Sequence, residues 1–226
     1  MELSHHRVGQ QDLMARVYGW MTLALVVTAG VAYYTATSEA ILSLIFSSSL
    51  VFYGLLIGEL VLVGYLVVAV NRMSAAAATG AFVGYSVLNG LTLSVIFLVY
   101  TQSSIAFTFL ICAGMFGVMS AYGYLTKSDL SSWGDFLFMG LVGIIIASLA
   151  NFFFRNETVY WVITYIGIMV FTGLTAYDTQ KIKRMSAEAY RGAEGERKAG
   201  IMGALILYLD FINLFLMLLR VFGRRR

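Results

Sequence analysis

The sequence predicts an all-α membrane protein that crosses the bilayer seven times. Hydrophobic residues occupy 60% of the 226 positions and charged residues only 12%, whereas soluble domains carry about 25% charged residues. The mean hydropathy is +0.82. The apolar residues form continuous runs of about 20, which suit membrane-spanning helices, and they do not alternate as in a membrane β-barrel.

The apolar runs predict a single seven-helix domain over residues 17–223, between a polar N-terminal tail (1–16) and a basic C-terminal tail (224–226). The expected spans are 17–35, 50–70, 78–100, 104–125, 134–154, 159–177 and 203–223. The first run is too long for the apolar region of a cleavable signal. The short run 40–46 either lies at the membrane interface or begins the second span early.

The distribution of lysine and arginine predicts a cytoplasmic N-terminus. In that orientation 10 of the 15 basic residues lie inside, six of them in the loop after the sixth span, and 5 lie outside. The three terminal arginines fall outside if the last span crosses completely, and inside if it is re-entrant; we favour complete crossing. Segment 179–199 is mixed in charge and poor in apolar residues, so we expect a solvated cytoplasmic loop there.

Small residues and the single cysteine predict close packing. Pairs of small residues at four-residue spacing allow helices to approach closely. Such pairs are Gly54/Gly58, Gly80/Gly84 and Ala113/Gly117. Cys112 is the only cysteine, which excludes an intrachain disulfide, and we expect it to be a small buried hydrophobe.

Several function classes are disfavoured. The net charge of +3 resides in loops and tails, so it does not indicate nucleic-acid binding. Phosphate-binding loops, nucleophile elbows and zinc-ligand clusters are absent from the sequence. His5 and His6 are adjacent in the N-terminal tail, and we expect them to be solvated. The GxGD motif of intramembrane aspartyl proteases is missing around Asp178 and Asp210. We therefore expect neither catalysis nor a cofactor.

The last predicted span carries Asp210 among apolar neighbours. A charge at membrane depth costs roughly 2.5–3.5 kcal/mol on insertion scales, so such a residue is a functional-site hypothesis. At helical spacing Asp210 shares one stripe with other residues of the span. These are Gly203, Ile206, Asn213, Met217 and Arg220. A stripe of this kind should face protein or water, so this helix is expected inside a bundle.

Asp178 is the expected partner of Asp210, because consecutive spans are usually neighbours. It ends the sixth predicted span, in a polar strip with Thr172 and Thr175. Two carboxyl groups in a low-dielectric site cannot both ionise cheaply, so they share a proton. When deprotonated they repel each other and attract a hard cation such as calcium. The pair therefore predicts a proton-gated cation path.

Structural alternatives remain open at this stage. Asp178 could form an interfacial ion pair with Lys181 or Arg184, and Asp210 could bond to Asn or Thr side chains for packing alone. The two acids differ in depth by roughly 10 Å, unless the sixth span continues past residue 177 or the seventh begins among the headgroups. Glu59, in the second span, could bond to Thr92, to Asn89 or to another helix.

Four long segments, taken in order, resemble the Bax inhibitor-1 family, also called the transmembrane Bax-inhibitor-motif family, in its bacterial form. They are YSVLNGLTLSVIF (85–97), AGMFGVMSAYGYLTKSDLSSWG (113–134), TYIGIMVFTGLTAYDTQKIK (164–183) and LYLDFINLFLMLLRVFG (207–223). The resemblance covers nearly the whole chain. It implies a multi-pass protein of the bacterial inner membrane, in which six helices surround a central last helix.

The resemblance also implies a pH-sensitive calcium leak governed by Asp178 and Asp210, with calcium as a transiently bound, transported ion. The family places an acid in the second helix, where Glu59 stands. An arginine that latches onto the first aspartate corresponds best to Arg72, which lies slightly later than the pattern. Asn213 and Lys181 complete the expected polar residues of the site.

A second role implied by the resemblance is that of a regulator of a membrane-bound AAA protease, or a stress-response membrane protein without transport. The N-terminal tail or the polar loop would then make the contact. Deleting residues 4–11 separates the two roles, because a leak should survive the deletion.

Overall fold

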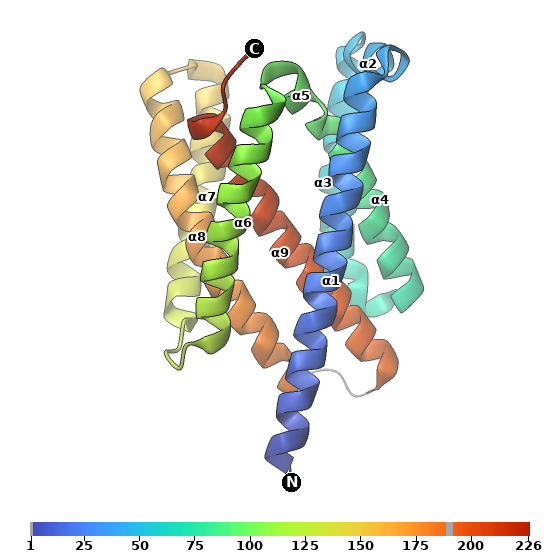
Figure 1. Cartoon of the computed structure of the whole chain (residues 1–226), viewed down its shortest axis with the longest axis vertical. Helices are drawn as coiled ribbons and strands as arrows, with labels where there is room; N and C mark the ends of the chain where they lie inside the picture. The colour runs from blue at the N-terminus through green and yellow to red at the C-terminus, as the bar shows by residue number, and fades with distance from the viewer. Residues whose placement is uncertain (1, 189–191) are drawn as a thin grey trace. The chain divides into compact units, whose positions relative to one another are not determined.

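The computed structural model describes residues 2–188 and 192–226, and this part of the chain is almost entirely helical. Seven of its helical segments are long and apolar enough to cross a membrane. The elements are α1 (Glu2–Thr37), α2 (Glu39–Phe46), α3 (Ser49–Ala69), the 3-10 turn η1 (Val70–Arg72), α4 (Ala75–Leu93), α5 (Val95–Val99), α6 (Gln102–Leu125), α7 (Ser131–Phe154), α8 (Glu157–Glu188) and α9 (Ala193–Phe222) (Figure 1). The predicted all-α, multi-pass fold is confirmed.

Three helices extend well beyond the predicted spans. α1 begins at Glu2, with its membrane-length apolar part at Gln10–Thr37. The side chains of His5 and His6 lie outside the described residues. α8 continues past residue 177 to Glu188, and α9 already begins at Ala193.

The prediction of a solvated loop over residues 179–199 is therefore wrong. Most of this polar segment prolongs α8 and α9, and residues 189–191 lie outside the described chain. The segment is rich in Lys, Arg, Glu and Ala, which favour helix. Glu194 and Lys198 also form a 3.6 Å ion pair four residues apart, a spacing that supports a helix.

The chain forms two compact units. The first comprises Met1–Thr101, Met185–Tyr208 and Arg225–Arg226. The second comprises Gln102–Arg184 and Leu209–Arg224. α9 thus contributes its first half to one unit and its second half to the other.

In the first unit α4 packs against both α1 and α3 (Figure 1). Tyr208 of α9 is fully buried there, and its ring meets the ring of Phe82 edge-on at 5.8 Å. The Tyr208 hydroxyl lies 2.7 Å from that of Thr28 on α1. A methyl group on Gly90 would come within 2.7 Å of Val31, so α1 and α4 approach this closely only because residue 90 is glycine.

In the second unit glycines mark the contacts between helices. Gly123 of α6 lies directly against the backbone of Ala176 on α8. Gly134 of α7 lies against the ring of Tyr177. A methyl group on Gly167 of α8 would be 3.1 Å from the sulfur of Met217 on α9. α8 is thus closely packed against α6 and α7 at the two residues before Asp178, and against α9 nearer its start.

The glycines that the sequence analysis singled out do not make these contacts. A methyl group placed on Gly54, Gly58, Gly80, Gly84 or Gly117 would meet nothing within 4 Å in the described chain. The predicted close contacts at these positions are therefore wrong. Four-residue spacing places two small residues on one face of a helix, but it does not determine which face packs.

Burial distinguishes α9 from the other spans. In its most apolar window 72% of residues are buried, against 11–44% in the other six. The expected interior position of this helix agrees with its burial. Cys112 on α6 is fully buried as predicted, and its thiol lies 3.7 Å from the carbonyl oxygen of Phe211 on α9.

Candidate functional site

The structure brings Asp178 of α8 and Asp210 of α9 together within the second unit. Their side chains lie close enough to share a hydrogen bond. Asp210 is buried, with 6% of its surface exposed, and Asp178 is half-buried. Deprotonated carboxylates can only accept hydrogen bonds, so a hydrogen bond between the two groups needs one shared proton.

The pair can meet because α8 does not end at residue 177. Asp178 lies inside a helix that continues to Glu188, within a span of membrane length, Glu157–Met185. The expected difference in depth therefore disappears. Gly123 of α6 contacts Ala176, two residues before Asp178, and Gly167 contacts Met217 of α9, so close helix packing positions the first aspartate.

Asp210 keeps one unused acceptor. Its Oδ2 atom is buried without a hydrogen-bond partner in the part of the chain described. An unsatisfied buried polar atom is rare in native proteins and is often found at functional sites. The hydroxyl oxygen of Thr172, on α8, is also buried and unpartnered there. Thr175 instead donates to the Phe171 carbonyl of its own helix at 2.8 Å.

The basic residues after Asp178 have different surroundings. Lys181 is exposed, interacts electrostatically with Asp178 and lies 5.8 Å from the centre of the Tyr177 ring. Arg184 pairs with Asp129 instead, at 2.8 Å. Of the two basic residues considered as partners of Asp178, Lys181 interacts with it electrostatically, whereas Arg184 forms its ion pair with Asp129.

A group of polar contacts, here called the Gln180 clasp, follows Asp178 directly. It joins the end of α8 to the end of α6 and the loop after it. Gln180 accepts from the Leu130 amide at 2.9 Å and donates to the Ser128 carbonyl at 2.8 Å. Lys183 donates to the Tyr124 carbonyl at 2.6 Å. Arg184 completes the clasp through Gln180 and Asp129.

Sequence reasoning missed the clasp. Its only signal was the position of Gln180 and Lys183 in the segment DTQKIK, immediately after the aspartate. The loop that they contact, between α6 and α7, lies about 50 residues earlier in the chain.

Asp129 lies in that loop, outside the membrane-spanning helices. The backbone amide of Ser131, the Ser131 hydroxyl and then Arg184 lower the pKa of the Asp129 carboxyl to about 2. Asp129 is therefore ionised at neutral and mildly acidic pH, and its pair with Arg184 does not respond to pH in that range.

Glu59 has a resolved partner in the first unit. The Thr92 hydroxyl on α4 donates to Glu59 Oε1 on α3 at 2.7 Å. Of the partners considered from the sequence, the structure selects Thr92. The amide of Asn89 lies 3.3 Å from the Tyr85 hydroxyl.

Arg72 belongs to the first unit and Asn213 to the second. Arg72 ends η1 in the first unit and is exposed. The side-chain amide of Asn213 donates to the Leu209 carbonyl of its own helix at 2.8 Å. The latching role of Arg72 stays a prediction.

Among the described residues no group of three or more His, Cys, Asp or Glu is arranged to hold a metal ion. Calcium prefers six to eight oxygen ligands. The two carboxyl groups, including the unpartnered Oδ2 atom of Asp210, supply fewer oxygens than this. Such a set suits a brief contact with a passing cation better than tight binding.

Comparison with known proteins places the chain in a family. A family model described as "Inhibitor of apoptosis-promoting Bax1" matches residues 10–226. The chain is 55% identical over 221 residues to the inner membrane protein YbhL of Escherichia coli K12, which covers 97% of this chain and 94% of that protein.

Two further relatives are uncharacterized proteins. One, from Borreliella burgdorferi, is 46% identical over 217 residues, covering 96% of this chain and 94% of the relative. The other, from Deinococcus radiodurans, is 42% identical over 215 residues, covering 95% and 91%. These matches span nearly the whole chain, and they show that this multi-pass inner-membrane protein belongs to the Bax inhibitor-1 family.

Proposed function

We propose that the protein is a calcium leak in the inner membrane and that the proton shared by Asp178 and Asp210 gates it. The observation that carries the proposal is the close approach of these two carboxyl side chains, one of them buried, inside membrane-length helices. Intramembrane acids of this kind usually mark ion or proton paths.

The mechanism follows from the charge of the pair. With a proton present, the shared hydrogen bond ties α8 to α9 and the path is closed. Without it, two carboxylates in a low-dielectric site repel each other strongly. They then separate or take up a cation, and a divalent oxygen-seeking ion relieves the repulsion best. Flux should therefore rise as pH rises. The pair performs no catalysis in this scheme, and calcium is cargo.

The proposed orientation has the N-terminus in the cytoplasm. The excess of lysine and arginine on that side supports it. In the first unit, the start of α9 lies near the start of α4. Arg197 and Ile201 of α9 line the same cavity as Ala75 and Ala76 of α4. The Arg226 amide instead donates to the Val99 carbonyl, at the far end of the α4–α5 span. This geometry supports a complete crossing, with the C-terminus outside.

The test is calcium flux in liposomes that contain the purified protein and an enclosed calcium-sensitive dye, measured across a range of pH. Asp210→Asn retains the shape and hydrogen-bonding capacity of the side chain but never ionises, so flux should lose its pH response. The matched control is Asp135→Asn, which neutralises an exposed acid of the same unit and should respond to pH as the wild type does.

Two results would contradict the proposal. An unchanged flux and pH response in Asp210→Asn would remove the pair from the mechanism. Absence of calcium flux at every pH, in protein that remains folded, would favour a role without transport, such as regulation of a membrane protease.

A further inference from the structure

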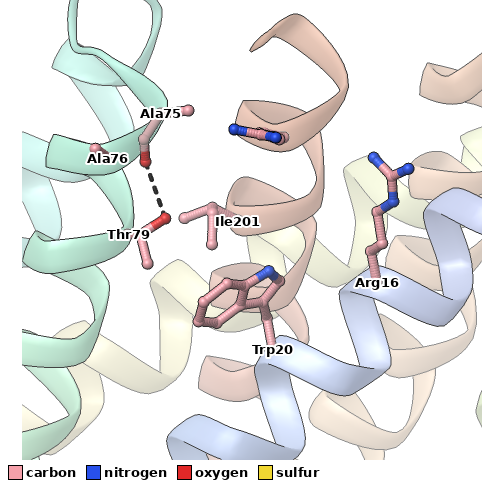
Figure 2. A pocket seen from close by; sticks show the side chains of 7 residues that line it. Arg16, Trp20, Ala75, Ala76, Thr79 and Ile201 are labelled. Carbon is pink, nitrogen blue, oxygen red and sulfur yellow. Dashed lines mark hydrogen bonds between the residues drawn. The ribbon is translucent and has the colours of Figure 1, made fainter. Parts of the chain in front are cut away.

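A second candidate site lies in the first unit, away from the aspartates. It is a cavity of about 420 Å³. The lining residues come from α1, α4 and α9 and are Arg16, Trp20, Ala75, Ala76, Thr79, Arg197 and Ile201. Figure 2 shows Trp20 projecting from α1 toward Ile201 and Thr79. Among the described residues, no acidic side chain lines the cavity.

The cavity carries positive charge that the protein compensates only weakly. Arg16 contacts Glu196 at 3.4 Å, and their side chains are 47% and 55% exposed. An ion pair so exposed contributes little, and either partner can readily exchange it for a stronger one. Arg197 is exposed and forms no ion pair within the described residues. Two guanidinium groups are therefore available to a ligand.

The start of α4 adds backbone donors. The first four amides of a helix have no acceptor within it. The Ser74 side chain accepts from the Ala77 amide at 3.2 Å, and the Ser74 carbonyl accepts from the Ala78 amide at 3.0 Å. The amides of Ala75 and Ala76 remain, and both residues line the cavity. The Thr79 hydroxyl donates a hydrogen bond to the Ala75 carbonyl at 2.9 Å (Figure 2).

The apolar wall indicates the level of the cavity in the membrane. Trp20 is half-buried and Ile201 is buried. Tryptophan concentrates where the hydrocarbon meets the headgroups, and long arginine side chains reach the same level from helix ends. The cavity also lies where the membrane-length part of α4 begins. It is thus placed where lipid phosphates are.

We propose that this cavity binds a phosphate group, supplied by the headgroup of an anionic phospholipid. Guanidinium groups recognise phosphate through paired, charge-assisted hydrogen bonds. Helix N-termini favour anions through their free amides and dipole. Basic pockets between membrane helices are suited to lipid headgroups, and the Trp20–Ile201 wall accommodates the adjoining glycerol and acyl carbons. Inorganic phosphate carries the same kind of charge as the lipid headgroup, but it lacks the glycerol and acyl carbons that would contact this wall.

Trp20 provides a local reporter. The chain has three tryptophans, so Trp133→Phe with Trp161→Phe leaves Trp20 alone, and both changes lie in the second unit. The full-length protein is placed in nanodiscs of phosphatidylcholine, with or without phosphatidylglycerol. Trp20 emission is followed as phosphatidylglycerol content rises, and separately as inorganic phosphate is added to the phosphatidylcholine discs. Native mass spectrometry counts the bound lipids.

The expected result is a saturable response of Trp20 to phosphatidylglycerol. A basic side chain near the membrane surface is worth about fivefold in affinity, so Arg16→Gln with Arg197→Gln should weaken binding about thirtyfold and each single change about fivefold. Glu196→Gln should strengthen binding, because it frees Arg16. The matched control, Arg226→Gln, removes one charge from the same unit at the Val99 end and should leave binding unchanged.

A response to inorganic phosphate as well would support the phosphate site and assign a soluble ligand to it. Trp20 emission that ignores both probes would overturn the proposal. So would an equal loss in Arg226→Gln, since binding would then reflect overall charge alone. Thermal unfolding of each variant confirms that it is folded, and Glu196→Gln keeps the proposal falsifiable if the double variant does not fold.

Discussion

Gly123 of α6 lies so close to the backbone carbonyl of Ala176 on α8 that no side chain fits between the two helices. Ala176 is two residues before Asp178. The position of the first aspartate thus depends on a contact that only glycine allows. Because the obstacle is backbone and not the end of a flexible side chain, the helices would have to move apart to accept even a methyl group.

Gly123→Ala should destabilise the protein. Overpacking of this kind typically costs about 1–3 kcal/mol, which should appear as a lower unfolding temperature in detergent and a disturbed pH response of calcium flux. Gly117→Ala is the control on the same helix, because its methyl group would meet nothing within 4 Å. Equal unfolding temperatures for the two variants would contradict the packing argument.

Gln180→Ala should loosen the end of α8. Gln180 is 6% exposed, and its loss leaves the Leu130 amide and the Ser128 carbonyl without their partner. Leu130 is buried and Ser128 is exposed, so only the Leu130 amide would be left unsatisfied in the interior, at a cost of about 1–3 kcal/mol. Hydrogen exchange at the Leu130 amide should become faster. Gln102→Ala, at an exposed position in the same unit, should leave that exchange rate unchanged.

Asp129→Asn should lower the unfolding temperature slightly and by the same amount at every pH from about 5 to 8. The pKa of Asp129 is lowered to about 2 in the folded protein, from about 3.9 in an unfolded chain. A lowered pKa stabilises the fold above the unfolded value, and this stabilisation is lost as pH falls through the folded value. The difference between variant and wild type should therefore shrink between about pH 4 and pH 2. A difference that changed between pH 5 and 8 would refute the assignment.

Thr92→Val should destabilise the first unit by about 0.6 kcal/mol, the average for hydrogen bonds between membrane helices, and by no more than about 1.7 kcal/mol. The substitution keeps the shape of the side chain but removes the donor to Glu59. Thr92→Ser retains the hydroxyl and should recover most of the loss. Equilibrium unfolding of both variants measures the difference, and equal stability would show that the contact contributes nothing.

The double variant Asp178→Asn with Asp210→Asn should affect the pH dependence of flux no more than either single change. Groups that act as one unit give strongly non-additive effects, and here a single shared proton is lost in all three variants. Effects that added up on a logarithmic scale would indicate two independent titrating sites in place of one pair.

The structure agrees with some of the contacts predicted from the sequence and contradicts others. Asp178 and Asp210 are paired in the sequence analysis because they lie in consecutive spans, and their side chains interact in the structure. Thr92 was one of several partners considered for Glu59, and the structure selects it. The prediction of close contacts at the glycine pairs is wrong because spacing along a helix does not determine which face meets a neighbour. The prediction of a polar loop is wrong because hydrophilic residues also extend helices beyond the membrane.

The chain by itself determined the membrane class, the seven spans and the pair of intramembrane acids, because hydrophobicity over a bilayer width and the cost of a charge within it are local properties of sequence. Only the tertiary structure decided which glycines pack, which groups the Gln180 clasp joins, and that Arg16 and Arg197 share a cavity. Those contacts join residues far apart in the chain, and they depend on the rotation and depth of each helix. Packing between helices determines this rotation and depth, and the sequence of a single span does not specify either.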